Sequence, residues 1–182
     1  MATPRTLLEA AAVARHFASV KVYSRNATNR EAFTREMREA LDLHVAPVAS
    51  AQEAVADADV VMCATTSTTP VFDPSWLKPG AHINTVGPRA QGESELDASI
   101  AARVRVVATD SLRQLRSSAA PYVLADTPWM EAMVELGDIV VGKHTGRHSP
   151  DDITLFCTAG LSGTEVAVAS EALRRAGHSE VL

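Results

Sequence analysis

The sequence predicts an α/β fold built on a doubly wound parallel sheet. Strand and helix patterns alternate along most of the chain, which is typical of a parallel sheet with helices on both faces. Residues 59–65 and 81–87 are apolar runs of strand length, and each opens into a polar or glycine-containing loop. Because ligands of such sheets lie outside the carboxyl ends of the strands, the loops at 65–67 and 86–88 are the first candidates for a ligand site.

The elements before residue 59 follow this alternation. The apolar pattern predicts a helix over residues 6–17 and a short strand over residues 20–23. It predicts a second helix over residues 28–41, with its apolar side chains on one face. Residues 45–48 predict a second strand. Ser50 and Glu53 have the spacing of a capping box, in which the Ser50 hydroxyl accepts from the amide of residue 53 and Glu53 reaches back, so a short helix should run to about residue 58.

The second half continues with a turn at 78–80 that leads into the strand at 81–87. Residues 96–102 predict a short helix, 104–109 a strand, 111–117 and 128–136 two helices, 143–150 a polar loop and 153–157 a last strand. A closing helix is expected over 163–176, within a C-terminal helical segment 163–182, because Arg174 and Arg175 occupy its last turn and Gly177 follows.

Composition limits the class of protein. The 182 residues are enough for one buried core, and 46% hydrophobic with 21% charged residues is ordinary for a globular domain. The net charge of −5 argues against a nucleic-acid binder, and no apolar stretch has the length of a membrane span. Cys63 and Cys157 lie in apolar runs and are expected to be reduced core thiols. We therefore expect a cytoplasmic protein that binds neither nucleic acid nor membrane.

One part of a doubly wound sheet is not found in this sequence. In the strand order 3-2-1-4-5-6 the first strand lies in the centre and ends in the glycine-rich turn that holds a pyrophosphate. Here the predicted helix at 6–17 comes first, and the first glycine is Gly80. We therefore expect residues 1–182 to form a single, incomplete domain without its central strand. Two unpaired strand edges should then lower its solubility or stability.

The chain resembles the ornithine cyclodeaminase/mu-crystallin family. The match is carried by the stretches VKVYSRN (20–26), ADVVMCATTS (58–67), PVFDPSWLKPGAHINTVG (70–87), GDIVVGKHTGR (137–147) and DDITLFCTAGLSGTEVA (151–167). The resemblance implies an NAD(P)-binding Rossmann-type domain that begins just after the glycine loop. It also implies a homodimer and an imino or amino acid as substrate. The family's N-terminal substrate and dimerisation domain has no counterpart in these residues.

By this resemblance, ten residues in four strand-end loops are candidates for binding the cofactor. Arg25 stands where an acidic residue would bind the ribose of NAD, and a guanidinium suits a 2′-phosphate, so NADP is favoured over NAD. Each loop is open to a plainer interpretation, as a polar connection or a strand-ending turn. The candidates are Ser24, Arg25, Asn26, Thr65, Thr66, Ser67, Val86, Gly87, Thr158 and Gly160.

The chain departs from the family pattern after Gly87. Deaminating members carry an Asp there as the acid/base group, whereas this chain reads Pro88-Arg89. An Arg cannot act as a base at neutral pH, so the catalytic residues stay unassigned. Arg89 has two open interpretations, binding of a substrate carboxylate or simple exposure to solvent. The charged stretch at 93–97, which contains Glu95, is expected to be a solvated first helical turn.

No metal site is predicted. His144 and His148 are four residues apart, as in helical zinc sites, but Gly146 interrupts a helix and no third ligand is near in sequence.

The departure at Arg89 favours NAD(P)-dependent reduction or oxidation of a small imino or amino acid over ornithine cyclodeamination. Hydride transfer needs no protein nucleophile, because the cofactor carries the chemistry. Three alternatives stay open: a cyclodeaminase, a non-catalytic binder of NADPH or another small ligand, and a truncated fragment without activity of its own.

Overall fold

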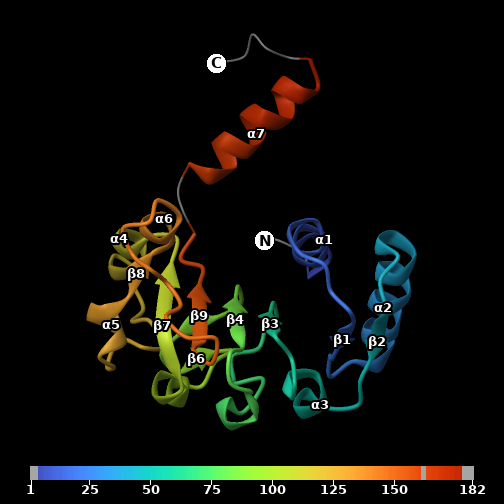
Figure 1. The fold of residues 1–182 in the computed structure, drawn as a ribbon, viewed down its shortest axis with the longest axis horizontal. Helices are drawn as coiled ribbons and strands as arrows, with labels where there is room; N and C mark the ends of the chain where they lie inside the picture. The colour runs from blue at the N-terminus through green and yellow to red at the C-terminus, as the bar shows by residue number, and fades with distance from the viewer. Residues whose placement is uncertain (1–3, 161–162, 178–182) are drawn as a thin grey trace.

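The computed structural model describes residues 4–160 and 163–177. Within them the strands form a five-stranded sheet, a two-stranded parallel sheet and a two-stranded hairpin (Figure 1). The elements in chain order are α1 (Pro4–Ala14), β1 (Val20–Val22), α2 (Ala27–Leu41), β2 (Val45–Pro47), α3 (Ala51–Val55), β3 (Val60–Cys63), the 3-10 helix η1 (Pro74–Trp76), β4 (His82–Thr85), β5 (Arg89–Ala90), β6 (Glu93–Ser94), the 3-10 helix η2 (Ala98–Ala102), β7 (Val104–Thr109), α4 (Leu112–Arg116), α5 (Trp129–Ala132), β8 (Val134–Glu135), α6 (Leu136–Val140), β9 (Ile153–Cys157) and α7 (Thr164–Arg175).

The larger sheet has the strand order β3-β4-β9-β7-β8, and every pair in it is parallel. Cys63 pairs with Thr85, and Thr85 pairs with Cys157, so β3, β4 and β9 end level with one another. The predicted α/β class with a parallel sheet is confirmed. The matched strand ends place the loops that follow them side by side.

The main core lies on one face of this sheet. Alternate side chains along the strands point into it, and Ile83, Val107 and Leu155 are at most 1% exposed. The segments between residues 72 and 124 cover them, with Phe72, Ile100 and other apolar side chains.

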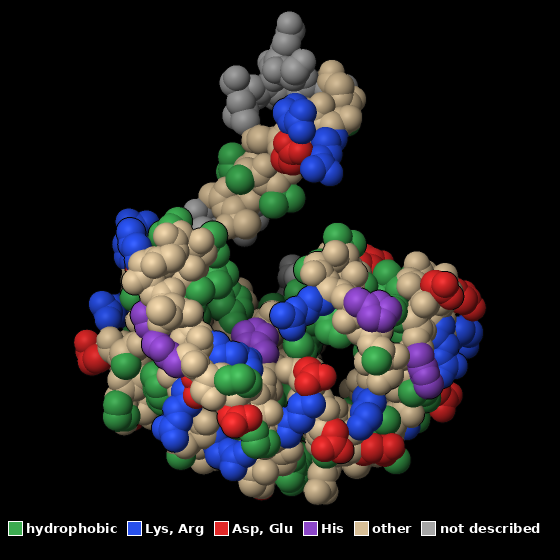
Figure 2. Space-filling view, viewed as in Figure 1, with side chains coloured by type: hydrophobic (Ala, Val, Ile, Leu, Met, Phe, Trp, Pro, Cys, Tyr) green, Lys and Arg blue, Asp and Glu red, His purple; other side chains and the backbone are tan. Residues whose placement is uncertain are grey.

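The other face of the sheet is partly open. Met62, His82 and Phe156 point to it and line a cavity of about 1060 Å³. Helices α1 and α6 flank this cavity, and Figure 2 shows the molecule hollowed between them. Parallel strands are usually covered on both faces, and here one face is covered only at its margins.

The two-stranded sheet of β1 and β2 stands apart from the larger one. Helix α2 packs on it through Met37, which joins Leu8 of α1 and Val45 in a second small core. A cavity of about 350 Å³ separates β1 from β3 and is lined by residues of both strands. A doubly wound sheet would have its first strand at this place. That the fold is such a sheet without its central strand stays a prediction.

Several local expectations need correction. The helix expected over 128–136 ends as α5 at Ala132, because Val134 and Glu135 instead pair with Ala108 and Thr109 as strand β8. Part of the segment expected as a charged helical turn forms the hairpin β5–β6, and only a 3-10 helix follows it. The Ser50 cap is confirmed, since its hydroxyl accepts from the Glu53 amide at 3.1 Å, while the Glu53 carboxylate accepts from the amide of Ala49.

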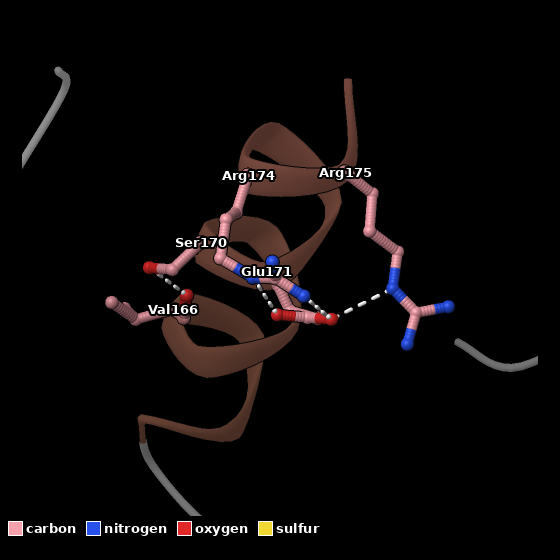
Figure 3. Close-up of polar contacts among 5 residues, drawn as sticks. All are labelled: Val166, Ser170, Glu171, Arg174 and Arg175. Atoms are coloured by element: carbon pink, nitrogen blue, oxygen red, sulfur yellow. Dashed lines mark hydrogen bonds and ion pairs between the residues drawn. The ribbon is translucent and has the colours of Figure 1, made fainter. Parts of the chain in front are cut away.

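Helix α7 extends away from the sheets (Figure 1). Its own ion pairs join the Glu171 carboxylate to Arg174 at 2.8 Å and to Arg175 at 2.7 Å (Figure 3). On the same helix Val166 and Val168 are about 60% exposed. Residues 178–182 of the predicted C-terminal segment lie outside the described residues. Among the described helices, none combines the length and the apolar character of a membrane span.

The core assignment predicts how two truncations differ. Leu155→Ala removes a side chain that is 1% exposed at the centre of the sheet, and we expect a loss of about 2–5 kcal/mol in the free energy of unfolding. Val140→Ala, at a side chain that is 76% exposed on α6, should change it by less than about 0.5 kcal/mol. The free energies of unfolding of both variants are measured by urea titration with circular dichroism as the readout. Equal losses would contradict the assignment of Leu155 to the core.

Candidate functional site at the carboxyl edge of the sheet

The loops singled out in the sequence gather at one edge of the molecule. Three of them follow β3, β4 and β9, whose last residues are paired in register. The fourth follows β1 and faces the loop after β3 across a cavity of about 610 Å³. Chain segments far apart in sequence therefore meet at the place where ligands of parallel sheets lie.

Six of the ten candidate residues line this cavity. They come from the loops after β1 and β3 and are Ser24, Arg25, Asn26, Thr65, Thr66 and Ser67. Ser67 is buried and its hydroxyl donates to the carbonyl of Thr69 at 2.8 Å, so it shapes the loop. Thr65 and Thr66 are exposed residues. The other four candidates, in the loops after β4 and β9, lie farther along the same edge, outside this cavity.

Arg30 is a further residue of this cavity that sequence reasoning missed. Its Nη1 donates to the carbonyl of Ser24 at 2.8 Å, and its guanidinium carbon lies 5.9 Å from the ring centroid of Tyr23. The buried Nε of Arg30 has no partner among the described residues. Arg30 comes four residues after the helix cap Asn26, and a helical side chain points back toward the amino end, so this spacing was the available signal.

The charge around this cavity is positive. Arg25 is exposed beside Arg30, and the first turn of α2 contains no acidic residue. The amino end of a 15-residue helix adds a partial positive charge. Among the described lining residues there is neither Asp nor Glu. The part of the cavity next to Arg25, Arg30 and the start of α2 therefore suits a phosphate.

Glu95 connects the loops after β3 and β4. The expectation of a solvated turn was wrong for this residue, whose exposure is 0%. Its carboxylate accepts from Thr65, through both the amide and the hydroxyl, and from the Thr85 hydroxyl and the amides of Val86 and Gly87. The backbone N–H groups of both loops are thereby directed at a single side chain.

A second carboxylate and an arginine hold the loop after β9. Asp110 accepts from the Ala159 amide at 2.6 Å and from the Gly160 amide at 3.0 Å. From the other side, Nη2 of Arg89 donates to the Ala159 carbonyl at 3.0 Å. Arg89 is half-buried and lines a neighbouring cavity of about 500 Å³, so the interpretation that it merely faces solvent is wrong.

The cysteines are buried and unpaired, as expected. Burial raises the pKa of Cys157 to about 12, and it raises the pKa of Cys63 still further. The buried Tyr122 hydroxyl donates to the Cys157 sulfur. Both thiols are therefore protonated at neutral pH and are poor nucleophiles.

The two histidines of the 143–150 loop are engaged locally. Nδ1 of His144 accepts from the Gly146 amide at 3.0 Å, and the ring of His148 is within hydrogen-bond reach of the Thr145 hydroxyl. Within residues 4–160 and 163–177 there is no group of three His, Cys, Asp or Glu side chains with the arrangement of a metal site.

Comparisons with known proteins agree on a family. The model of the ornithine cyclodeaminase/mu-crystallin family matches residues 2–178. A Delta(1)-pyrroline-2-carboxylate reductase of Bacillus cereus is 31% identical over 167 residues, which are 90% of this chain and 51% of that protein. The chain spans about half the length of the curated relatives it matches.

Two solved structures are similar to the whole described fold. The Delta(1)-pyrroline-2-carboxylate reductase of Thermococcus litoralis, in complex with NADH and L-proline, has a TM-score of 0.80 at 29% identity and covers 95% of this chain and 55% of its own. An archaeal alanine dehydrogenase dimer with bound NAD has a TM-score of 0.82 at 26% identity. The match covers 96% of this chain and 54% of that protein's chain.

The close approach of Gly87 to Glu95 gives a test of this geometry. A Cβ at Gly87 would lie 2.4 Å from Oε2 of Glu95 and 2.5 Å from the Thr65 carbonyl oxygen. We expect Gly87→Ala to lower the free energy of unfolding by about 1–3 kcal/mol. The matched control is Gly137→Ala in α6, where a Cβ meets no atom within 4 Å, and its stability should be unchanged or slightly higher. Thermal melts compare the stability of the two variants with that of the parent chain. An unchanged stability of Gly87→Ala would contradict the close approach of Gly87 to Glu95.

Proposed function

This chain belongs to the ornithine cyclodeaminase/mu-crystallin family, and on that basis we propose that it forms the dinucleotide-binding part of an NAD(P)-dependent oxidoreductase. The observation that carries the proposal is the cavity of about 610 Å³ in which the loops after β1 and β3 face each other. Reductases and dehydrogenases of known structure, in complexes with NADH or NAD, are similar to the whole fold. Val86, Gly87, Thr158 and Gly160 would continue the site toward the nicotinamide.

The charges favour NADP(H) as the cofactor. In NAD-specific sites a carboxylate accepts from the ribose hydroxyls, whereas an arginine accommodates a 2′-phosphate. Arg25 is exposed at the mouth of the cavity, and Arg30 lines it with a buried Nε that has no partner among the described residues. Guanidinium groups bind phosphate through paired N–H donors. The 2′-phosphate would lie between Arg25 and the start of α2.

The proposed reaction is reduction of a small imino acid, or oxidation of the matching amino acid. A bound nicotinamide would supply or take up the hydride at the carbon of the C–N bond. Arg89 lies next to the loop after β9, with its guanidinium held by the Ala159 carbonyl and bordering the cavity of about 500 Å³. We propose that Arg89 binds the substrate carboxylate. An arginine at this place disfavours cyclodeamination, which needs an acid/base group there. Like its relative described as a dimer, the functional protein is proposed to be a homodimer.

A non-catalytic dinucleotide binder is the second candidate. It is favoured by the state of the two carboxylates at this edge, Glu95 and Asp110, which both accept backbone N–H groups. A carboxylate occupied in this way is poorly placed to move a proton. Binding of the cofactor without turnover of any imino acid would support this candidate over the enzyme.

The cofactor proposal predicts a selective effect of two substitutions. Titrating the chain with NADPH and NADH, by nucleotide fluorescence, should show tighter binding of NADPH. Arg25→Gln and Arg30→Gln should each weaken NADPH binding by about tenfold or more, since each removes a charge-assisted contact, and should leave NADH nearly unchanged. Arg35→Gln, at an exposed position of the same helix, is the control. Equal losses for both nucleotides would refute the phosphate assignment, and no binding of either would refute the proposed function.

The substrate proposal is tested by turnover. NADPH consumption is measured with a panel of cyclic imines that carry a carboxylate, together with the same rings without it. We expect consumption only with the carboxylates, and Arg89→Gln should raise KM by about tenfold or more with a smaller change in kcat. The exposed Arg113 on α4 provides the control Arg113→Gln. If Arg89→Gln left KM unaltered, the carboxylate would have to bind elsewhere.

A further inference from the structure

The buried carboxylate of Glu95 has two separate sets of donors. Oε1 accepts from the Thr85 hydroxyl at 2.6 Å, the Gly87 amide at 2.7 Å and the Val86 amide at 3.2 Å. Oε2 accepts from the Thr65 amide at 2.9 Å and from its hydroxyl at 2.8 Å. One oxygen thus serves the loop after β4 and the other serves the loop after β3.

Glu95 is itself fixed by the main chain. Its amide donates to the Pro88 carbonyl at 2.9 Å, and its carbonyl accepts from the Val71 amide at 3.0 Å. Residue 94, directly before it, belongs to the hairpin β5–β6. The carboxylate is therefore held at a defined position, and the two loops are placed relative to it.

The loops after β3 and β4 pack tightly against the Glu95 carboxylate. The space that a side chain at Gly87 would need is occupied by Oε2 of Glu95 and by the Thr65 carbonyl oxygen. Thr65 also lines the cavity of about 610 Å³. The Glu95 carboxylate therefore fills the space between the loops after β3 and β4, beside the backbone bond from the Val86 amide to the Cys63 carbonyl at 3.0 Å.

We propose that Glu95 is the positioning residue of the dinucleotide site, holding the loops after β3 and β4 as one unit across which the cofactor lies. The inference rests on the proposed function for the identity of the ligand. Glu95 does not contact the cofactor in this role. It acts through the amides of Thr65 and Gly87, and its lone pairs are used for positioning rather than for proton transfer.

The division between the two oxygens makes the proposal testable with an isostere. A glutamine side chain has the same shape, but one of its two terminal atoms is a donor. Each oxygen of Glu95 faces at least one backbone N–H, so either orientation of the amide sets a donor against a donor. Glu95→Gln should therefore release one loop although it changes almost no volume.

The experiment measures amide hydrogen exchange in the 182-residue chain, together with NADPH binding. In Glu95→Gln we expect exchange over residues 64–67 or 85–88 to rise by about tenfold or more, while exchange over α2 stays as in the parent chain. NADPH binding should weaken by about tenfold or more. Glu93→Gln, at an exposed position of the same hairpin, should change neither quantity.

Two results would overturn the inference. Unchanged exchange in both loops would show that Glu95 does not hold them. An equal rise in the loops and in α2 would show a general loss of stability instead of a positioning role. If the parent chain bound no NADPH while the loops of Glu95→Gln still opened locally, the proposed function would fail and the loop-holding role of Glu95 would stand.

Discussion

The buried carboxylate of Glu95 is the interaction on which the candidate site depends. A carboxylate removed from water is costly unless hydrogen bonds replace its hydration. Here five donors replace it, one from the last residue of β4 and four from the loops after β3 and β4. Hydrogen bonds to a charged group are stronger than neutral ones. The same contacts give the amides of Thr65 and Gly87 a hydrogen-bond partner at the strand ends. The hydrogen bonds that compensate for the burial of Glu95 are thus the same ones that order the loops after β3 and β4.

Charged side chains also lie at both ends of the candidate site, on either side of Glu95. At one end, Arg25, Arg30 and the start of α2 make the cavity positive, which suits a phosphate. At the other end, Asp110 and Arg89 hold the Ala159–Gly160 turn from opposite sides, through its amides and a carbonyl. Charged side chains therefore fix backbone at this edge as much as they offer contacts to a ligand. This explains how the site proposed for an anionic cofactor can contain two carboxylates.

The strands show what local sequence could predict. The runs that became β3, β4, β7 and β9 were predicted because buried parallel strands are apolar along most of their length. Strand β8 was missed because Val134 and Glu135 continue a helix-like pattern, and only pairing with β7 makes them a strand. Arg25 was found by its position after a strand, whereas Arg30 has its meaning only through the Ser24 carbonyl and the cavity.

By itself, the sequence determined the α/β class, the resemblance to a family and the strand-end loops that make up the candidate site. These depend on apolar periodicity and on local motifs, which are readable within a few residues. The tertiary structure decided the burial and the hydrogen bonds of Glu95, which in sequence belongs to a run of charges typical of a solvated turn. Its partners at Thr65 and Thr85 are 30 and 10 residues away. A charged residue in such a run is buried only when distant segments supply the donors, and only the folded chain brings those donors together.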